Sequence, residues 1–232
     1  MTALIKVALI LFTLFASTFL LLNLTGILTV ELIEQWLTQA KELSPTYMGL
    51  FVISLLFLDL FVAVPTLTVA ILAGYFLGHS YGFIAVLIGF SMAGMGGYCL
   101  SRWYGGKLLT ALIKDEQKRD EAITMFQKHG LVTILLSRAM PILPEVSACL
   151  AGMMKLRFRT FLSAWLVSTV PYAFIATYAG SISSIDNPKP AIFIAIGLSG
   201  LLWACWFFYH RALQEDQLAK RRNKVIALCI AN

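Results

Sequence analysis

The chain has 232 residues, of which 59% are hydrophobic and only 13% are charged, and its mean hydropathy is +0.81. Soluble domains carry about 25% charged residues, so this composition excludes an ordinary soluble protein and indicates an integral membrane protein. The net charge of +6 does not indicate binding to nucleic acid, because the Lys and Arg residues cluster in a few loops, as expected of a membrane protein that follows the positive-inside rule.

Residues 1–44 are predicted to form an N-terminal membrane anchor and an interfacial helix. The apolar run 7–28 is long, and no small-x-small cleavage site follows it, so an uncleaved anchor helix is expected rather than a signal peptide. After it, the spacing of Leu32, Trp36 and Leu43 is typical of a helix that lies along the membrane interface.

The core is predicted over residues 45–183. It contains four apolar segments. Pro65 lies near the middle of the first, and Pro141 and Pro144 lie near the middle of the third. A helix that is interrupted at bilayer depth leaves backbone groups unpaired, which is tolerated only inside protein or beside a water-filled cavity. We therefore predict that these two segments, 49–77 and 131–154, are re-entrant helical hairpins.

Between residues 102 and 130 lies the only long charged stretch of the core. Its interspersed apolar residues predict a surface helix, and Gly130 is the expected C-cap that ends it. Beyond the core, residues 184–232 are predicted to form a last transmembrane helix, at 191–209, and a basic cytoplasmic tail.

The distribution of Lys and Arg favours the re-entrant topology. If six apolar segments all crossed the membrane, nine basic residues would lie inside and eight outside. With two re-entrant hairpins, fifteen lie inside and two outside, with Arg138 left in the membrane. Because Lys and Arg in short loops set the orientation, we predict an all-α polytopic membrane protein with two re-entrant hairpins, about four full transmembrane helices and both termini in the cytoplasm.

The two hairpin segments resemble each other. The first reads "DLFVAVPTLTVAILAG" from Asp59 to Gly74, and the second reads "RAMPILPEVSACLAG" from Arg138 to Gly152. In both, a charged residue precedes a proline by six positions and an Ala-Gly pair follows. The copies would enter from opposite faces, which is the pattern of inverted-repeat transporters with a site near the bilayer midplane.

Three charged residues of these segments are the candidate site. Arg138 is predicted to attract a lipid phosphate, because its planar guanidinium binds phosphate through two parallel hydrogen bonds. Asp59 and Glu145 are predicted to act as a gate for Arg138 or as proton carriers, with fixed counter-ions as the open alternative. The remaining candidates, predicted to serve hairpin architecture, are Pro65, Gly74, Pro141, Pro144 and Gly152.

The stretches "FLDLFVAVPTLTVAILAGYFLG", "GGYCLSRWYGG" and the segment around "SRAMPILPEVSACLAGMMKLRFRTF" resemble the DedA family, also called the SNARE-associated or VTT-domain family. The similarity covers roughly residues 45–183. It implies a membrane protein with paired re-entrant hairpins that moves lipids between leaflets, such as undecaprenyl phosphate in bacteria or phospholipids in eukaryotes. It places Asp59 at the acidic residue of the first motif and Arg138 at the first arginine of the second.

The chain also departs from the bacterial family pattern. A second acid is missing, since Thr66 to Thr68 follow the first proline, and Pro144 stands where a second arginine is common. The Arg-x-x-Pro-x-x-Pro motif therefore resembles the branch with two prolines in the second hairpin. Glu145 is one residue that could supply the missing acid.

The first hypothesis is accordingly a flippase or scramblase for a phosphate-bearing lipid, in a bacterial inner membrane or, since composition does not exclude it, an organelle membrane. The alternative is a scaffold for membrane integrity or membrane-protein assembly. We expect no enzyme, cofactor, metal site or nucleic-acid partner, because the four cysteines and three histidines show no ligand or nucleophile–base spacing. The five tryptophans are expected to be interface anchors or packing residues, and the oligomeric state is left open.

Overall fold

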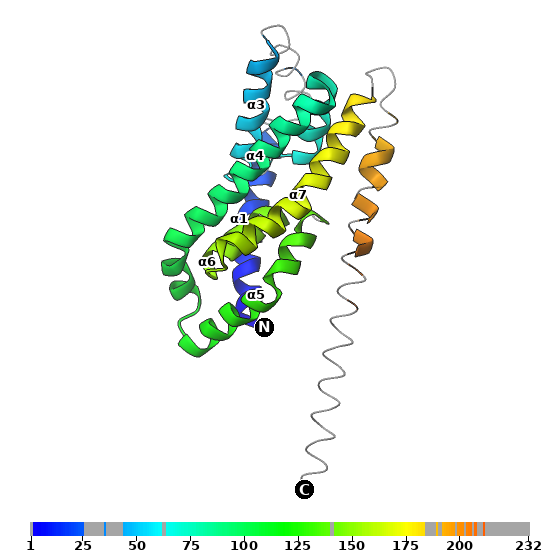
Figure 1. Cartoon of the computed structure of the whole chain (residues 1–232). Coiled ribbons are helices and arrows are strands. Elements are labelled where there is room, and N and C mark those ends of the chain that lie inside the picture. Colours follow the sequence, from blue (N-terminus) through cyan, green and yellow to red (C-terminus); the bar gives the residue numbers. More distant parts are fainter. Residues whose placement is uncertain are drawn as a thin grey trace.

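The structure is a computed structural model, which describes residues 2–25, 44–61, 64–139 and 142–183, with position 35 and several positions between 189 and 211. Every element in this described part is helical, so the predicted all-α class is confirmed (Figure 1). The elements are α1 (Thr2–Thr25), α3 (Pro45–Leu58), α4 (Thr66–Leu112), α5 (Glu116–Leu136), the 3₁₀ helix η1 (Ser137–Ala139), α6 (Leu143–Met153) and α7 (Phe158–Ser181).

Helix α4 consists of two helices that meet at Gly78. The backbone of Gly78 has φ 74° and ψ 167°, which is outside the helical region and open to glycine because it has no Cβ. The chain reverses there, since a Cβ on Gly82 would lie 2.7 Å from the carbonyl oxygen of Ala73. The short part, 66–77, is thus antiparallel to the long part, 79–112.

The charged stretch 102–130 was predicted to be one surface helix, but it is divided between the end of α4 and the start of α5. Helix α4 continues to Leu112, and α5 begins after Asp115, whose carboxylate accepts hydrogen bonds from the backbone N–H of Gln117 (3.1 Å) and of Lys118 (3.4 Å). Asp115 is therefore the N-cap of α5. The ammonium of Lys118, 3.0 Å from the same carboxylate, holds the pKa of Asp115 below its ordinary value.

The predicted C-cap at Gly130 is wrong. Helix α5 passes through Gly130 and ends at Leu136. The buried residues Ala122, Phe126, Gly130 and Ile134 recur every four positions, so one continuous stripe faces the core and the helix gains more by continuing than by stopping. A Cβ on Gly130 would crowd the ring of Phe126, so the position of this ring favours glycine at residue 130.

Each predicted hairpin segment forms a helix, a turn and a second helix. In the first, α3 is followed by a turn at residues 59–61 and by the short part of α4. In the second, α5 is followed by η1 and by α6, which begins after Ile142. Pro65 stands at the N-cap of α4, where its missing N–H is not needed, and Pro144 lies within the first two positions of α6 for the same reason. Pro141 lies outside the described residues.

The two halves of the core repeat the same order of elements. A helix, a turn, a short helix, a reversal with positive φ and a long helix occur first in residues 45–112 and again in 116–181. The reversal is at Gly78 in the first half and at Lys155 (φ 55°) in the second. The second lies between α6 and α7, where the N–H of Lys155 donates to the carbonyl of Gly152.

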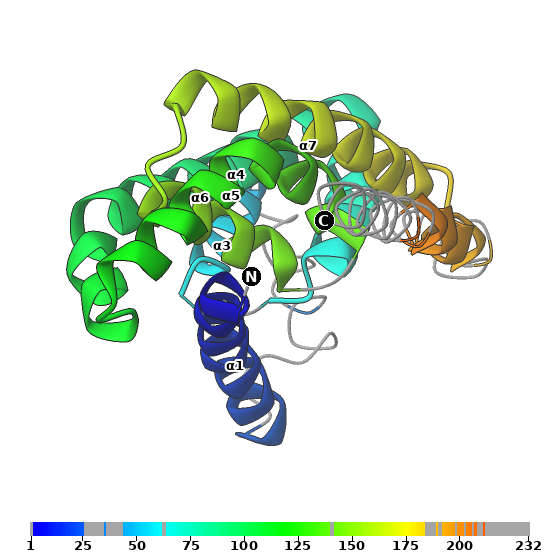
Figure 2. The same ribbon diagram turned by 90° about the horizontal axis from the view of Figure 1, so that it is seen from below.

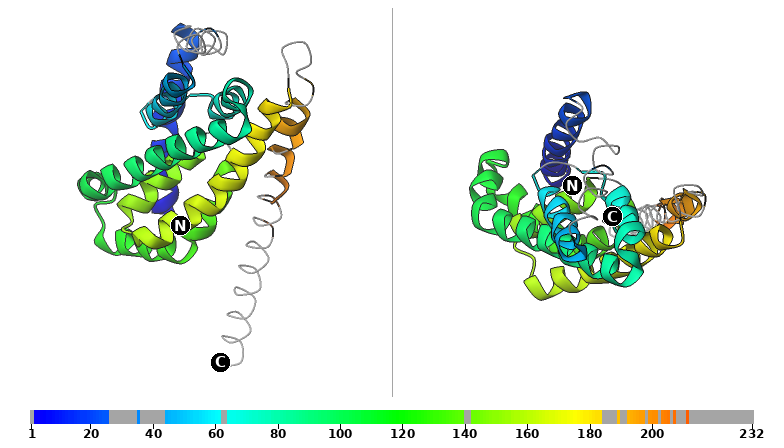
Figure 3. Two further views of the ribbon diagram at one scale, coloured as in Figure 1. Left: turned by 45° about the horizontal axis from the view of Figure 1, so that its top comes forward. Right: turned by 90° about the horizontal axis from the view of Figure 1, so that it is seen from above.

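The long helices of the two halves pack side by side and run antiparallel (Figures 1 and 3). Along their contact, Phe90 of α4 lies near Tyr172 of α7, whereas Tyr98 lies near Phe161, so the numbering rises on one helix as it falls on the other. The equivalent long helices of the two halves therefore point in opposite directions.

The short helix of each half crosses the long helix of the other half. Gly74, in the short part of α4, lies against the backbone of Thr177 in α7, and Gly152, in α6, lies against the carbonyl oxygen of Tyr98 in α4. A Cβ at either glycine would overlap these backbone atoms, so both positions require glycine for close helix contact.

Two described helical segments are long and apolar enough to cross a membrane: Thr66–Ala111, which Gly78 divides, and Phe158–Ser181. Helix α1 lies on the opposite side of α6 from α7 (Figure 2) and buries Val7 and Phe15 in the same hydrophobic cluster as residues of α5, α6 and α7. The predicted interfacial helix, the last transmembrane helix and the basic tail fall outside the described residues or only partly within them.

Candidate functional site

The three candidate charged residues lie at the two hairpin turns. Asp59 follows the last residue of α3, Arg138 lies in η1 after α5, and Glu145 is in the first turn of α6. Asp59 and Arg138 are buried, with exposed fractions of 4% and 8%, and Glu145 is half-buried. Ionisable side chains buried between two apolar hairpins are costly unless they are compensated, so their partners determine what this site can do.

Asp59 holds the first hairpin turn together. Its Oδ1 atom accepts a hydrogen bond of 2.8 Å from the backbone N–H of Val64, directly before Pro65 and α4. The carboxylate thus pairs a buried donor that the turn leaves without a backbone partner. Asp59 therefore has a structural role in addition to any role in function.

Arg138 is held at the middle of α7. Its Nη2 atom donates a hydrogen bond of 3.1 Å to the hydroxyl of Thr169. Helix α7 has 24 residues, about 36 Å at 1.5 Å per residue, and Thr169 is half-way along it. The buried Nε atom of Arg138 has no hydrogen-bond partner in the structure described. One strong donor is therefore free at the centre of the helix pair.

Three aromatic rings surround the guanidinium of Arg138. Its Cζ atom lies 4.1 Å from the ring centroid of Phe90, 5.1 Å from Trp165 and 5.2 Å from Tyr172. Such contacts attract a cation, by about 2 kcal/mol when it is desolvated. The cation is therefore compensated mainly by ring faces and a hydroxyl.

Sequence reasoning missed these partners of Arg138. Trp165 was expected to anchor or pack, and it does pack, since it is buried, but its ring also faces the arginine. A signal was available, because Trp165, Thr169 and Tyr172 follow one another at spacings of four and three and so share one face of a helix. That pattern does not reveal which residue the face contacts.

The two acids interact with each other. Asp59 and Glu145 act on each other electrostatically across the two hairpin turns. Both acids also act electrostatically on Arg138. Among the described residues, however, neither acid lies within ion-pairing distance of Arg138, so the site brings all three together without a direct salt bridge.

Polar contacts also fix the two reversals of the core. At one reversal, the hydroxyl of Tyr98 donates to the carbonyl of Leu156 (2.6 Å), and Arg102 donates to the same hydroxyl (2.9 Å) and carbonyl (3.3 Å). At the other, the hydroxyl of Thr177 lies 3.2 Å from Nδ1 of His79. Arg102 thus ties α4 to the α6–α7 turn.

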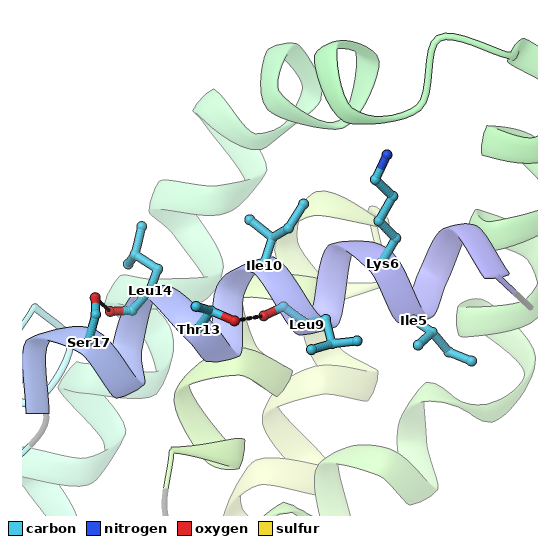
Figure 4. Close-up of a pocket in the computed structure, with 7 residues that line it drawn as sticks. All are labelled: Ile5, Lys6, Leu9, Ile10, Thr13, Leu14 and Ser17. Carbon is cyan, nitrogen blue, oxygen red and sulfur yellow. Dashed lines mark hydrogen bonds between the residues drawn. The ribbon is translucent and has the colours of Figure 1, made fainter. Parts of the chain in front are cut away.

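A separate apolar groove of about 740 Å³ runs along α1 (Figure 4). The hydroxyls of Thr13 and Ser17 in it bond to backbone carbonyls of their own helix, so Lys6 carries the charge of the described lining. None of these residues belongs to the Arg138 cluster. The described lining is Ile5, Lys6, Leu9, Ile10, Thr13, Leu14 and Ser17.

Comparison with known proteins places the fold in a family. Comparison with curated proteins and with solved structures found no match. The family model of the VTT domain matches residues 64–182, which is more than half of the chain. The match begins just before α4 and ends one residue after α7, so it includes both long helices, Arg138 and Glu145. This chain therefore belongs to the VTT-domain family, the DedA or SNARE-associated family of membrane-associated proteins.

Proposed function

We propose that this protein is a lipid transporter of the flippase or scramblase type, and that Arg138 binds the phosphate of the lipid headgroup. The observation that carries the proposal is a buried arginine at the centre of two apolar long helices, with a free Nε donor and without an ion pair to the acids beside it. A phosphate supplies the negative charge and the acceptor oxygens that this donor lacks.

The membrane arrangement is part of the proposal. The long part of α4 and α7 cross the bilayer, while the hairpins α3–α4 and α5–α6 enter from opposite faces and return. The N-terminus of α1 and the α4–α5 connection, which carries Lys114 and is followed by Lys118 in the first turn of α5, lie at the same end of the molecule (Figure 1). Their positive charge makes that end cytoplasmic, and the bacterial inner membrane is the proposed location.

In the proposed mechanism, the headgroup moves between the hairpin turns while the acyl chains stay in the bilayer. Arg138 donates to the phosphate, and its delocalised charge replaces hydration that the headgroup loses. Asp59 and Glu145 share a proton while phosphate is bound. Loss of that proton leaves two carboxylates beside the arginine, which then compete with the phosphate and release it.

We expect Lys114→Cys, in a chain without the other cysteines, to react with a membrane-impermeant maleimide only from the cytoplasmic face. Tyr47→Cys at the start of α3, where Tyr47 is 65% exposed, should react only from the other face and is the matched control. Both experiments use right-side-out and inverted vesicles. Labelling of Lys114→Cys from the outer face contradicts the re-entrant arrangement.

The function is tested by lipid movement in liposomes that contain the purified protein. A fluorescent polyprenyl phosphate and a fluorescent phospholipid are compared, each with wild type and with Arg138→Lys. Lysine keeps the charge but loses the planar pair of donors, so we expect translocation of the transported lipid to slow at least tenfold. Arg159→Lys, an exposed basic residue at the start of α7, should move lipid as wild type does.

Preference for one lipid, lost with Arg138→Lys, supports the proposal and identifies the lipid class. If folded wild type moves neither lipid, the transporter is excluded and the alternative scaffold function is favoured. If wild type and Arg138→Lys move lipid equally, the protein transports lipid but Arg138 does not bind the phosphate.

A further inference from the structure

The charge of the Arg138 guanidinium lies beside two acids but is not paired with either of them. Two carboxyl groups act on its guanidinium electrostatically, yet neither lies within ion-pairing distance in the part of the chain that the structure describes. The attraction between an arginine and a carboxylate offsets the desolvation of a buried pair only when the geometry of the pair is good. The guanidinium is held by its other contacts and does not pair with Asp59 or Glu145.

The aromatic rings around Arg138 are positioned by the two long helices and not by the arginine. The indole Nε1 of Trp165 donates a hydrogen bond of 3.2 Å to the backbone carbonyl of Phe90, which joins α7 to α4. The indole lies where a Cβ of Gly94 would otherwise be. The rings of Phe90 and Tyr172 are 6.0 Å apart. The box of three rings is thus part of the α4–α7 interface.

The hydrogen bond from Arg138 to Thr169 orients the guanidinium within this box. One edge of the cation is used by Thr169, and its face lies over Phe90 at 4.1 Å. The Nε donor remains free. The box therefore compensates the charge and leaves the Nε donor without a partner among the described residues.

We propose that Phe90, Trp165, Tyr172 and Thr169 are positioning residues that hold the Arg138 guanidinium apart from the Asp59–Glu145 pair. This arrangement prevents the internal salt bridge that would neutralise the arginine. Its consequence for phosphate binding rests on the proposed function, whereas the separation of the charges does not.

The separation is tested by double-mutant cycles on thermal unfolding of the purified protein in detergent. The cycle combines Arg138→Gln with Glu145→Gln, first in wild type and then in Phe90→Leu. In wild type the two midpoint shifts should show only weak coupling, because Glu145 acts on Arg138 without a direct ion pair. In Phe90→Leu the arginine is free to pair with the acids, so the shifts should become clearly non-additive, because residues in direct contact couple.

Conservative variants separate positioning from packing. Phe90→Tyr keeps a ring face and should behave as wild type, and Tyr172→Leu, which removes a different ring, should increase the coupling as Phe90→Leu does. Tyr172→Leu also serves if Phe90→Leu does not fold. Coupling that is already strong in wild type, or that does not rise in either ring variant, overturns the inference.

Binding of a short-chain phosphatidic acid supplies the second readout. Phe90→Leu should weaken binding about tenfold, and adding Asp59→Asn and Glu145→Gln should restore it, because the competing carboxylates are gone. If Phe90→Leu weakens binding only by disturbing the structure, the two acid substitutions will not restore binding. Binding that stays weak in the triple variant therefore overturns the inference. If wild type neither binds nor moves lipid but the coupling rises as expected, the positioning role stands and the proposed function fails.

Discussion

Gly180→Ala is expected to destabilise the protein severely. Gly180 of α7 lies against the backbone of the short part of α4, and a Cβ there would overlap the carbonyl oxygen of Ile71. The obstacle is backbone, so a side-chain rotation cannot relieve it and the crossing helices must separate. Overpacking of this kind costs about 3 kcal/mol or more at the upper end of its range. The thermal midpoint in detergent should fall on the order of 10 °C.

Gly106→Ala is the matched control for this prediction. Gly106 also lies inside a long helix, α4, but a Cβ there has no heavy atom within 4 Å. Alanine is the better helix former by about 0.5–1 kcal/mol, so this variant should be as stable as wild type or slightly more so. If Gly180→Ala matched Gly106→Ala, the close crossing of α4 and α7 would be incorrect.

Asp59→Ala and Asp59→Asn are expected to separate the structural role of Asp59 from its proposed role in release. Alanine leaves the buried N–H of Val64 without its 2.8 Å acceptor, which costs about 1–3 kcal/mol. Asparagine keeps an acceptor oxygen for Val64 and should retain most of the stability. Asparagine cannot become a carboxylate, so it cannot compete with the phosphate for Arg138. Release of the lipid should therefore be slower, and lipid translocation should slow at least tenfold.

The comparison uses thermal midpoints in detergent and translocation rates in liposomes, with Ser54→Ala as the control. The Ser54 hydroxyl bonds only to the Leu50 carbonyl of its own helix, at an exposed position, so its loss should change neither quantity. Equal stability of Asp59→Ala and wild type would show that the turn does not depend on Val64. Normal transport by Asp59→Asn would exclude the gating role.

Several features of the fold could be predicted from the sequence because their signals are local. Pro65 and Pro144 interrupt apolar runs, and a proline without an N–H is accommodated at a helix start. The paired motifs of Asp59–Gly74 and Arg138–Gly152 predicted the repeated order of elements, since the equal spacing of charge and proline reflects the same local structure. Gly130 misled for a related reason, because glycine ends a helix only where the buried stripe also ends.

The sequence by itself determined that the chain is helical, that two hairpin turns interrupt apolar segments, and that Arg138, Asp59 and Glu145 belong to those turns. Only the tertiary structure decided which groups each charge contacts. Opposite signs on two hairpins predicted a meeting of Asp59 with Arg138, yet the aspartate bonds to Val64 and lies beside Glu145, while the arginine lies among Phe90, Trp165 and Tyr172. Those rings come from helices far away in the chain, and their positions follow from how closely α4 and α7 approach through Gly94, a distance that neither helix encodes alone.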